Sequence, residues 1–229
     1  MKYTTLLLDL DETLFDFSKS EKFAIDKLME KYNIPVTEEN RRLYSKINDE
    51  KWKKLERGEL TRPQLFRERF DDFFKKTGVT ADTDEANLSY MQFLSQASFI
   101  LDGALETCKK LSGNYSIYLV TNGTKIVQNG RLSGSPIMKY IKDVFISEEI
   151  GFNKPKKEYF DYVLEHIEEK DKTKILVVGD SLSSDISGAE NSGLDSCWVN
   201  RKNQKTVSDA TYTISCITEI FDILQNNSN

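Results

Sequence analysis

The chain has 229 residues, of which 38% are hydrophobic and 30% are charged, and its net charge at pH 7 is −5. These proportions are typical of a soluble globular protein of one or two domains, and they exclude collagen, coiled-coil rods and small disulfide-rich proteins. The charge gives no overall attraction to polymeric nucleic acid or to an anionic membrane. Because the chain has only 11 Gly and 4 Pro, a helix-rich structure is favoured over a turn-dense all-β one.

The cysteines and the apolar segments indicate a cellular compartment. Cys108, Cys197 and Cys216 form no CxxC pair, and three widely spaced cysteines predict reduced thiols rather than a disulfide framework. The apolar run that begins at Thr4 is soon interrupted by acidic residues, unlike a secretion signal. No stretch approaches the roughly 18 uninterrupted apolar residues of a membrane-spanning helix. We therefore expect a cytoplasmic protein with no membrane partner.

The first predicted element is a buried strand over residues 4–10, where leucine and β-branched residues follow one another without alternation. Between about residues 15 and 99, long charged segments carry apolar residues at helical spacing. Four helices are predicted there, over residues 19–33, 38–57, 62–76 and 83–97. Their limits are supported by two capping-box spacings and two stop signals: Ser18 with Glu21, Thr61 with Gln64, Gly58 and Gly78. These helices should pack on one another as a small bundle.

Helices and strands alternate from residue 102 onward. The predicted helices cover residues 104–111, 125–132, 155–169, 184–192 and 217–224, and the predicted strands cover residues 115–120, 143–146, 175–178 and 196–199. This alternation indicates an α/β fold with a doubly wound parallel sheet. We expect a core formed by residues 1–14 and 100–229, with a helical domain, residues 15–99, inserted after the first strand.

Polar residues follow the predicted strands at their carboxyl ends, where doubly wound sheets bind their ligands. They are Asp9, Asp11, Thr121, Asn122, Lys154, Asp180 and Asp185. Two carboxylates about 4 Å apart repel each other by roughly 4 kcal/mol at an effective dielectric constant of 20. The four aspartates therefore predict a bound cation, and hard oxygen ligands with no His or Cys nearby favour Mg²⁺. Lys154 would supply a second positive charge.

A site with Mg²⁺, a lysine, a hydroxyl group and backbone N–H groups suits a phosphate group. Asp9, at the end of a strand, is placed to attack phosphorus and form an aspartyl-phosphate. Asp11, two residues later, could protonate the leaving oxygen and then take a proton from water.

These residues form four ordered motifs. They are Asp9-x-Asp11-x-Thr13, Thr121-Asn122-Gly123, Lys154-Pro155 and Gly179-Asp180-x-x-x-x-Asp185. In this order they resemble the haloacid-dehalogenase (HAD) superfamily, in its phosphatase branch, between residues 9 and 185. The dehalogenases of that superfamily lack the second aspartate of the first motif, so Asp11 favours a phosphatase. Glu12 is a departure, because many members have Gly at that position.

The resemblance implies roles for the motif residues. Asp9 would be the nucleophile and Asp11 the acid and base. Magnesium would be held by the carboxylates of Asp9 and Asp180 and by the main-chain oxygen of Asp11. The transferring phosphoryl group would be held by Thr121 and the amide of Asn122 and neutralised by Lys154, with Asp185 orienting Lys154. The inserted helices would be a type-one cap that closes over the site and excludes polymeric nucleic acid.

A narrower resemblance extends over residues 146–151, 154–155, 160–162 and 193–200, which look like the YjjG/YfnB group of bacterial pyrimidine 5′-nucleotidases. It implies that the substrate is a small phosphorylated metabolite, a nucleoside monophosphate with a pyrimidine base. A short sugar phosphate or phosphoglycolate is the alternative substrate. Two other classes are also open: a phosphorylatable signalling module like a response-regulator receiver, and a non-catalytic phosphate-binding protein. No oligomeric state is predicted.

Few residues of the predicted helical domain can be assigned a role. Phe15, Asp16 and Phe17 are possible substrate contacts, because the chain leaves the first motif there. Five aromatic residues have the spacing of a bundle core rather than of a base-stacking surface: Trp52, Phe66, Phe70, Phe73 and Phe74. Four arginines alternate with acidic residues and predict a solvated helix face: Arg57, Arg62, Arg67 and Arg69. His166, the only histidine, is expected at or near the surface.

Overall fold

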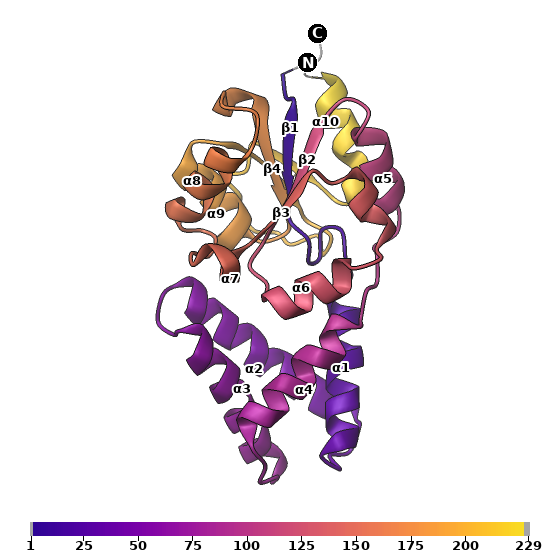
Figure 1. The fold of residues 1–229 in the computed structure, drawn as a ribbon, viewed down its shortest axis with the longest axis vertical. Coiled ribbons are helices and arrows are strands. Elements are labelled where there is room, and N and C mark those ends of the chain that lie inside the picture. Colours follow the sequence, from indigo (N-terminus) through magenta and orange to yellow (C-terminus); the bar gives the residue numbers. More distant parts are fainter. Residues whose placement is uncertain (1, 227–229) are drawn as a thin grey trace. The chain divides into compact units, whose positions relative to one another are not determined.

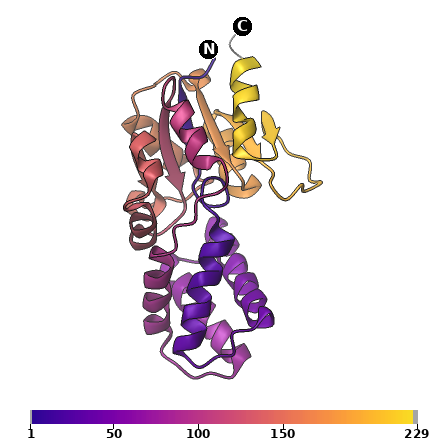
Figure 2. The same ribbon diagram turned by 90° about the vertical axis from the view of Figure 1, so that its right-hand side faces the viewer.

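The computed structural model describes residues 2–226 and divides into two compact units (Figures 1 and 2). The α/β unit contains the residues up to Asp16, Phe99–Lys125, and the residues from Leu132 onward. The helical unit contains Phe17–Ser98 and Ile126–Arg131. Among residues 2–226, every helix is too short or too polar to cross a bilayer.

The α/β unit is built on a six-stranded parallel sheet with the order β3-β2-β1-β4-β5-β6. The strands are β1 (Thr5–Leu8), β2 (Ser116–Thr121), β3 (Asp143–Ile146), β4 (Ile175–Gly179), β5 (Asp195–Val199) and β6 (Tyr212–Ile214). The first strand lies between β2 and β4, with Thr5 paired to both Ser116 and Ile175. The predicted fold class is confirmed, although β6 was not predicted.

Helices cover both faces of this sheet (Figure 1). Their bounds are α5 (Ala104–Leu111), α7 (Ser147–Ile150), α8 (Lys157–His166), α9 (Ser187–Ser192) and α10 (Ile220–Asn226), with 3₁₀ turns at Pro136–Tyr140, Lys172–Lys174 and Ile217–Glu219. Leu6 and Leu8 of β1 pack into one hydrophobic cluster with residues of α5 and α10, and Leu7 packs into another with residues of α8. Alternate side chains of a strand point to opposite faces. Because both faces are buried, β1 is a continuous apolar run.

The helical unit contains α1 (Phe17–Lys31), α2 (Glu38–Glu56), α3 (Arg62–Thr77) and α4 (Thr83–Ser95). These helices match the four predicted, but α1 begins at Phe17, so Ser18 lies inside its first turn rather than capping it. As predicted, α3 ends at Gly78, which has a left-handed φ of 73°. Aromatic rings fill the core: Tyr44 lies 5.6 Å from Phe70, 5.4 Å from Phe73 and 5.2 Å from Tyr90 between ring centroids.

The helix α6 (Lys125–Leu132) was predicted with the core, but residues 126–131 belong to the helical unit. Val127 packs into the hydrophobic core of that unit. The Arg131 guanidinium donates to the Ala97 carbonyl oxygen at 3.3 Å, and Ser98 Oγ donates to the Arg131 carbonyl oxygen at 2.8 Å. These contacts draw a segment that is distant in sequence into the bundle.

One arginine of the predicted solvated face is buried. Arg69 is only 3% exposed and donates to Asn48 Oδ1 at 3.1 Å and to Asn87 Oδ1 at 2.6 Å. Asn48 in turn donates to the buried Glu21 carboxylate at 2.9 Å. This polar network takes one residue from each of the four helices, and the aromatic ring of Tyr90 lies against the guanidinium at 4.7 Å. The prediction fails for Arg69 because its partners come from other helices.

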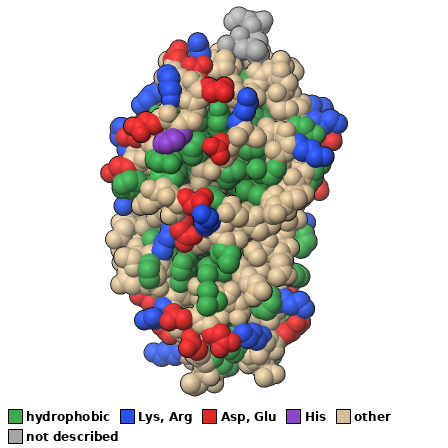
Figure 3. Space-filling view, viewed as in Figure 1, with side chains coloured by type: hydrophobic (Ala, Val, Ile, Leu, Met, Phe, Trp, Pro, Cys, Tyr) green, Lys and Arg blue, Asp and Glu red, His purple; other side chains and the backbone are tan. Residues whose placement is uncertain are grey.

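On the exterior, acidic and basic side chains are mixed on the face shown in Figure 3. Arg67, two residues before Arg69, is exposed and pairs with Asp84 at 3.0 Å. His166 is exposed, as predicted, and its ring stacks on Tyr162 at 4.0 Å. The three cysteines are free thiols, also as predicted.

The network and the exposed arginine generate a prediction about stability. Arg69→Ala should lower the free energy of unfolding by about 2–4 kcal/mol, because the buried oxygens of Asn48 and Asn87 lose their donors. Arg67→Ala on the same helix should cost about 0.5 kcal/mol or less, because its ion pair is exposed. Equilibrium urea unfolding of the two variants measures both values. Equal losses would contradict the importance of the buried network.

Candidate active site

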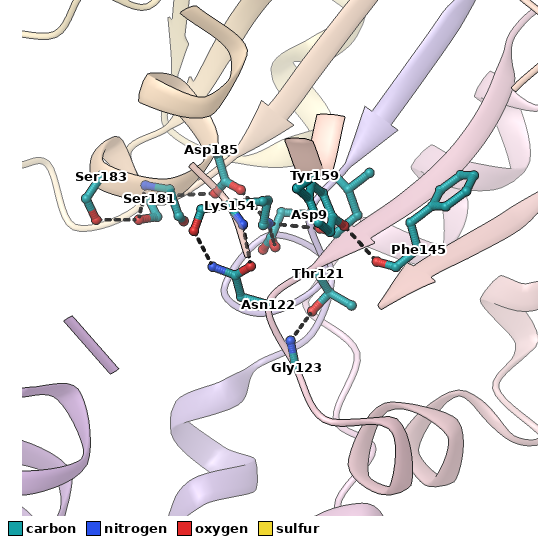
Figure 4. A network of polar contacts seen from close by, with 12 residues as sticks. Asp9, Thr121, Asn122, Gly123, Phe145, Lys154, Tyr159, Ser181, Ser183 and Asp185 are labelled. Atoms are coloured by element: carbon teal, nitrogen blue, oxygen red, sulfur yellow. Dashed lines mark hydrogen bonds and ion pairs between the residues drawn. The ribbon is translucent and has the colours of Figure 1, made fainter. Parts of the chain in front are cut away.

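The polar residues singled out in the sequence lie where three neighbouring strands end (Figure 4). Asp9 follows β1, Thr121 is the last residue of β2, and Asp180 follows β4. Lys154 lies in the connection between α7 and α8, and Asp185 lies in a π-helical turn at Leu182–Ile186 (η3). Because parallel strands end at the same edge of the sheet, these side chains from distant parts of the sequence share one site.

The Lys154 ammonium is the centre of the site. Its Nζ lies 2.6 Å from Asp9 Oδ1 and 2.6 Å from Asp185 Oδ1, and it donates to the Val120 carbonyl oxygen at 2.9 Å. The side chain is 1% exposed, and an ammonium has three donors, so the protein satisfies it fully. Burial lowers the pKa of Lys154, but the charges of Asp185 and Asp9 outweigh it and hold the pKa above its usual range. The lysine is therefore a permanent cation.

Neighbouring residues fix the backbone that carries Lys154. The Asn122 side chain donates to the Lys154 carbonyl oxygen at 2.9 Å and accepts from the Lys154 N–H at 2.8 Å. The Tyr159 hydroxyl, at the start of α8, donates to the Phe145 carbonyl oxygen at 2.7 Å, which ties this helix to β3. The sequence indicated only the backbone amide of Asn122 as functional. Its side chain was missed because the reciprocal pair joins two segments 32 residues apart.

Asp185 is fixed by the turn that follows β4. Its Oδ2 accepts from the Ser181 N–H at 3.0 Å, and its Oδ1 faces Lys154. Gly179 lies directly beneath this carboxylate, and a Cβ atom at that position would collide with it. The last residue of β4 is therefore glycine for a steric reason. Nearby, the Trp198 indole N–H donates to the Asp180 carbonyl oxygen at 2.8 Å, a support that the sequence did not reveal.

Three carboxylates share the site with this one lysine. Oxygens of Asp9, Asp180 and Asp185 all lie within 4.8 Å of one another. Burial, together with the charges of Asp185 and Asp11, raises the pKa of Asp9 to about 7 against the opposing effect of Lys154. Burial, with the charges of Asp9, Asp185 and Glu12, raises the pKa of Asp180 to about 9. The hard oxygen donors and the excess negative charge fit a divalent cation such as Mg²⁺.

The remaining predicted residues lie at differing depths. Asp11 is half-buried, outside the group of three carboxylates, and it belongs to the turn that leads from β1 to Phe15. Thr121 is 1% exposed, and its Oγ1 accepts from the Gly123 N–H at 3.3 Å. The site thus brings together carboxylates, a lysine and a hydroxyl group, and the roles assigned to them stay predictions.

The three possible substrate contacts have different environments. Phe15 is fully buried in the hydrophobic core of the α/β unit, which leaves no surface for a substrate. Asp16 is also buried, and its N–H donates to the Phe99 carbonyl oxygen at 2.8 Å. Phe17 is half-buried and packs against the core of the helical unit. Phe15 therefore acts in the core, and substrate contact by Asp16 and Phe17 stays a prediction.

Comparison with known proteins agrees with this geometry. The chain is 38% identical over 225 residues to the HAD-hydrolase YfnB of Bacillus subtilis, covering 97% of this chain and 96% of that protein. A magnesium-bound crystal structure of YfnB matches with a TM-score of 0.93 over 98% of this chain and 99% of that chain.

Two further relatives are pyrimidine 5′-nucleotidases. PynA of Streptococcus pneumoniae is 32% identical, covering 99% of this chain and 97% of that protein, and YjjG of Escherichia coli is 31% identical, covering 98% and 99%. The model of the haloacid dehalogenase-like hydrolase family matches residues 3–193. The family match, the relatives and the lysine-centred carboxylate site at the end of a parallel sheet all agree. The chain therefore belongs to the haloacid dehalogenase-like hydrolases.

Proposed function

We propose that this hydrolase is a magnesium-dependent phosphomonoesterase that acts through an aspartyl-phosphate on Asp9 and prefers pyrimidine nucleoside 5′-monophosphates. One observation carries the proposal: the permanent cation of Lys154 is buried between Asp9 and Asp185 at the carboxyl end of the sheet. A lysine in this position can neutralise an anionic group that meets the Asp9 carboxylate. The similarity to the pyrimidine 5′-nucleotidases PynA and YjjG supports the choice of substrate.

In the proposed reaction, an oxygen of Asp9 attacks phosphorus and the ester P–O bond breaks. Asp11 gives its proton to the leaving oxygen. Asp11 then takes a proton from a water molecule, which attacks the phosphorus of the aspartyl-phosphate and releases inorganic phosphate and the Asp9 carboxylate. During both steps, Thr121 and the backbone amide of Asn122 would hold the phosphoryl oxygens, and Lys154 would neutralise their charge.

Magnesium would be held by the Asp9 and Asp180 carboxylates and the main-chain oxygen of Asp11. When bound, the ion supplies positive charge that favours the ionised carboxylates and offsets the charge of the phosphate. Asp9 must be ionised to attack, and its raised pKa of about 7 works against ionisation. Asp185 positions Lys154 through the 2.6 Å ion pair and does not itself react.

The raised pKa values predict how stability depends on pH. Without divalent cations, folded Asp9 and Asp180 bind protons more tightly than the unfolded chain, in which Asp has a pKa of about 3.9. The free energy of unfolding should therefore fall as the pH rises from about 5 to about 9. Because Mg²⁺ needs ionised ligands, its stabilising effect should increase over the same range. Thermal unfolding in EDTA and in MgCl₂ measures both trends, and Asp180→Asn should weaken both. A magnesium effect that does not change with pH would contradict the assignment.

The two aspartates of the first motif should differ in their effect on turnover. Asp9→Asn should abolish hydrolysis, because no aspartyl-phosphate can form, whereas Asp11→Asn should retain substrate binding and lose about two to four powers of ten in kcat. Asp161→Asn, at a partly exposed position of α8, is the matched control and should leave kcat unchanged. Steady-state kinetics measures these effects, and mass spectrometry of the trapped enzyme should place the adduct on Asp9. An adduct on another residue would overturn the mechanism.

A substrate panel tests the proposed function directly. We expect kcat/KM for dUMP, dTMP and UMP to exceed the values for AMP, phosphoglycolate and hexose phosphates. If phosphoglycolate or a hexose phosphate exceeds every pyrimidine nucleotide by about tenfold, the substrate assignment is wrong while the phosphatase assignment stands. Absence of hydrolysis of every ester in the presence of Mg²⁺ would refute the phosphatase assignment itself.

A further inference from the structure

The turn that follows Asp9 contains an unusual backbone conformation. Glu12 has a φ of 61°, in the left-handed region. For a residue with a side chain this conformation costs roughly 1–2 kcal/mol. Its N–H donates to the Phe15 carbonyl oxygen at 2.7 Å, so Glu12 helps to close the turn that carries Asp11. Contacts to Glu12 therefore bear on where Asp11 lies.

Arg201, which lies just after β5, makes such a contact. Its Nη1 donates to Glu12 Oε2 at 2.7 Å and lies 3.5 Å from the Glu12 carbonyl oxygen. One guanidinium thus reaches both the side chain and the main chain of the strained residue. The pair links the end of β5 to the turn after β1, two segments 189 residues apart in sequence.

The segment that carries Arg201 is itself held in place. The Asn200 side chain donates to the Gln204 carbonyl oxygen at 3.0 Å and accepts from the Gln204 N–H at 2.8 Å. The Asn203 N–H donates to the Asn200 carbonyl oxygen at 3.1 Å. These bonds form a closed turn directly after β5. Because this turn fixes the backbone of Arg201, less conformational entropy is lost when its guanidinium pairs with Glu12.

The pair also affects the charge around the site. The Glu12 carboxylate adds a further negative charge near the acidic group of the site. A guanidinium at 2.7 Å offsets that charge without occupying the space among Asp9, Asp180 and Asp185. The contact therefore acts on the geometry of the first motif and on the charge near the site.

We propose that Arg201 is a positioning residue that acts through Glu12, holding the turn at residues 10–15 so that Asp11 can transfer its proton. This inference rests on the proposed function, because the role of Asp11 belongs to it. Loss of a purely structural ion pair would lower stability without a selective loss in kcat. The Arg201 and Glu12 side chains are 34% and 17% exposed, so the pair is partly shielded from water.

A double-mutant cycle tests the inference, with Arg201→Ala, Glu12→Ala and the double variant. Arg201→Ala should lower kcat about tenfold or more, because a displaced proton donor is costly. The KM should stay within about twofold, because phosphate binding is unchanged. The double variant should be no worse than the poorer single variant, and Arg201→Lys should recover part of kcat. Lys157→Ala, which removes an exposed pair with Asp161 on α8, is the control and should leave kcat unchanged.

Amide hydrogen exchange provides a readout that needs no turnover. In Arg201→Ala, the amides of Glu12 and Phe15, which donate within the turn, should exchange about three- to fivefold faster, as expected for loss of a pair of this kind. Unchanged exchange, or a fall in kcat that is matched in Lys157→Ala, overturns the inference. If the wild type hydrolyses no ester, the proposed function fails, and the exchange rates alone decide whether Arg201 holds the turn.

Discussion

The ion pairs of the Lys154 ammonium with Asp9 and Asp185 are the interaction on which the rest of the site depends. Both distances are 2.6 Å, and the lysine and Asp185 side chains are each 1% exposed. Removing one partner of a buried ion pair typically lowers the free energy of unfolding by about 3–5 kcal/mol, because the remaining charge is buried with neither a partner nor water to stabilise it. The turns after β1 and β4 and the connection before α8 are therefore constrained together. None of the three can move without leaving a buried charge unpaired.

The same site has more acidic than basic groups, with three aspartates and one lysine. Lys154 compensates only part of the negative charge of Asp9, Asp180 and Asp185, and burial makes the ionised forms of Asp9 and Asp180 unfavourable. Such an arrangement costs stability and is tolerated where it serves chemistry. The surroundings limit the cost: Ser181 and Trp198 bind Asp185 and the Asp180 backbone, respectively. The fold thus holds three carboxylates that repel one another beside a single buried lysine.

Local sequence was sufficient for much of the fold and for the members of the site. The unbroken apolar run of β1 indicated a strand buried on both faces, and the carboxyl-end rule for parallel sheets then brought Asp9, Thr121 and Asp180 together. Those inferences need only periodicity and strand order. The edge strand β6 was not predicted, because three residues are too few to show a hydrophobic pattern and only one of them is buried.

The missed contacts join segments that no local pattern connects. Arg69 looked solvated because acidic residues flank it, yet its partners are amides on α2 and α4. Residues 126–131 read as an ordinary crossover helix, but Val127 packs into the core of the helical unit and Arg131 bonds with Ala97 and Ser98.

The central place of β1 also has a consequence for synthesis of the chain. This apolar strand is synthesised well before both of its neighbours in the sheet, because β2 and β4 are encoded far downstream. Asp9 and Lys154 are 145 residues apart, an interval of about 7 to 30 s at an elongation rate of about 5–20 residues per second. Until then the nascent protein carries an unpaired leucine-rich segment and no assembled site. Newly made chains thus cannot assemble the site until Lys154 has emerged, and a chaperone that recognises short apolar segments would find a target in β1 during this interval.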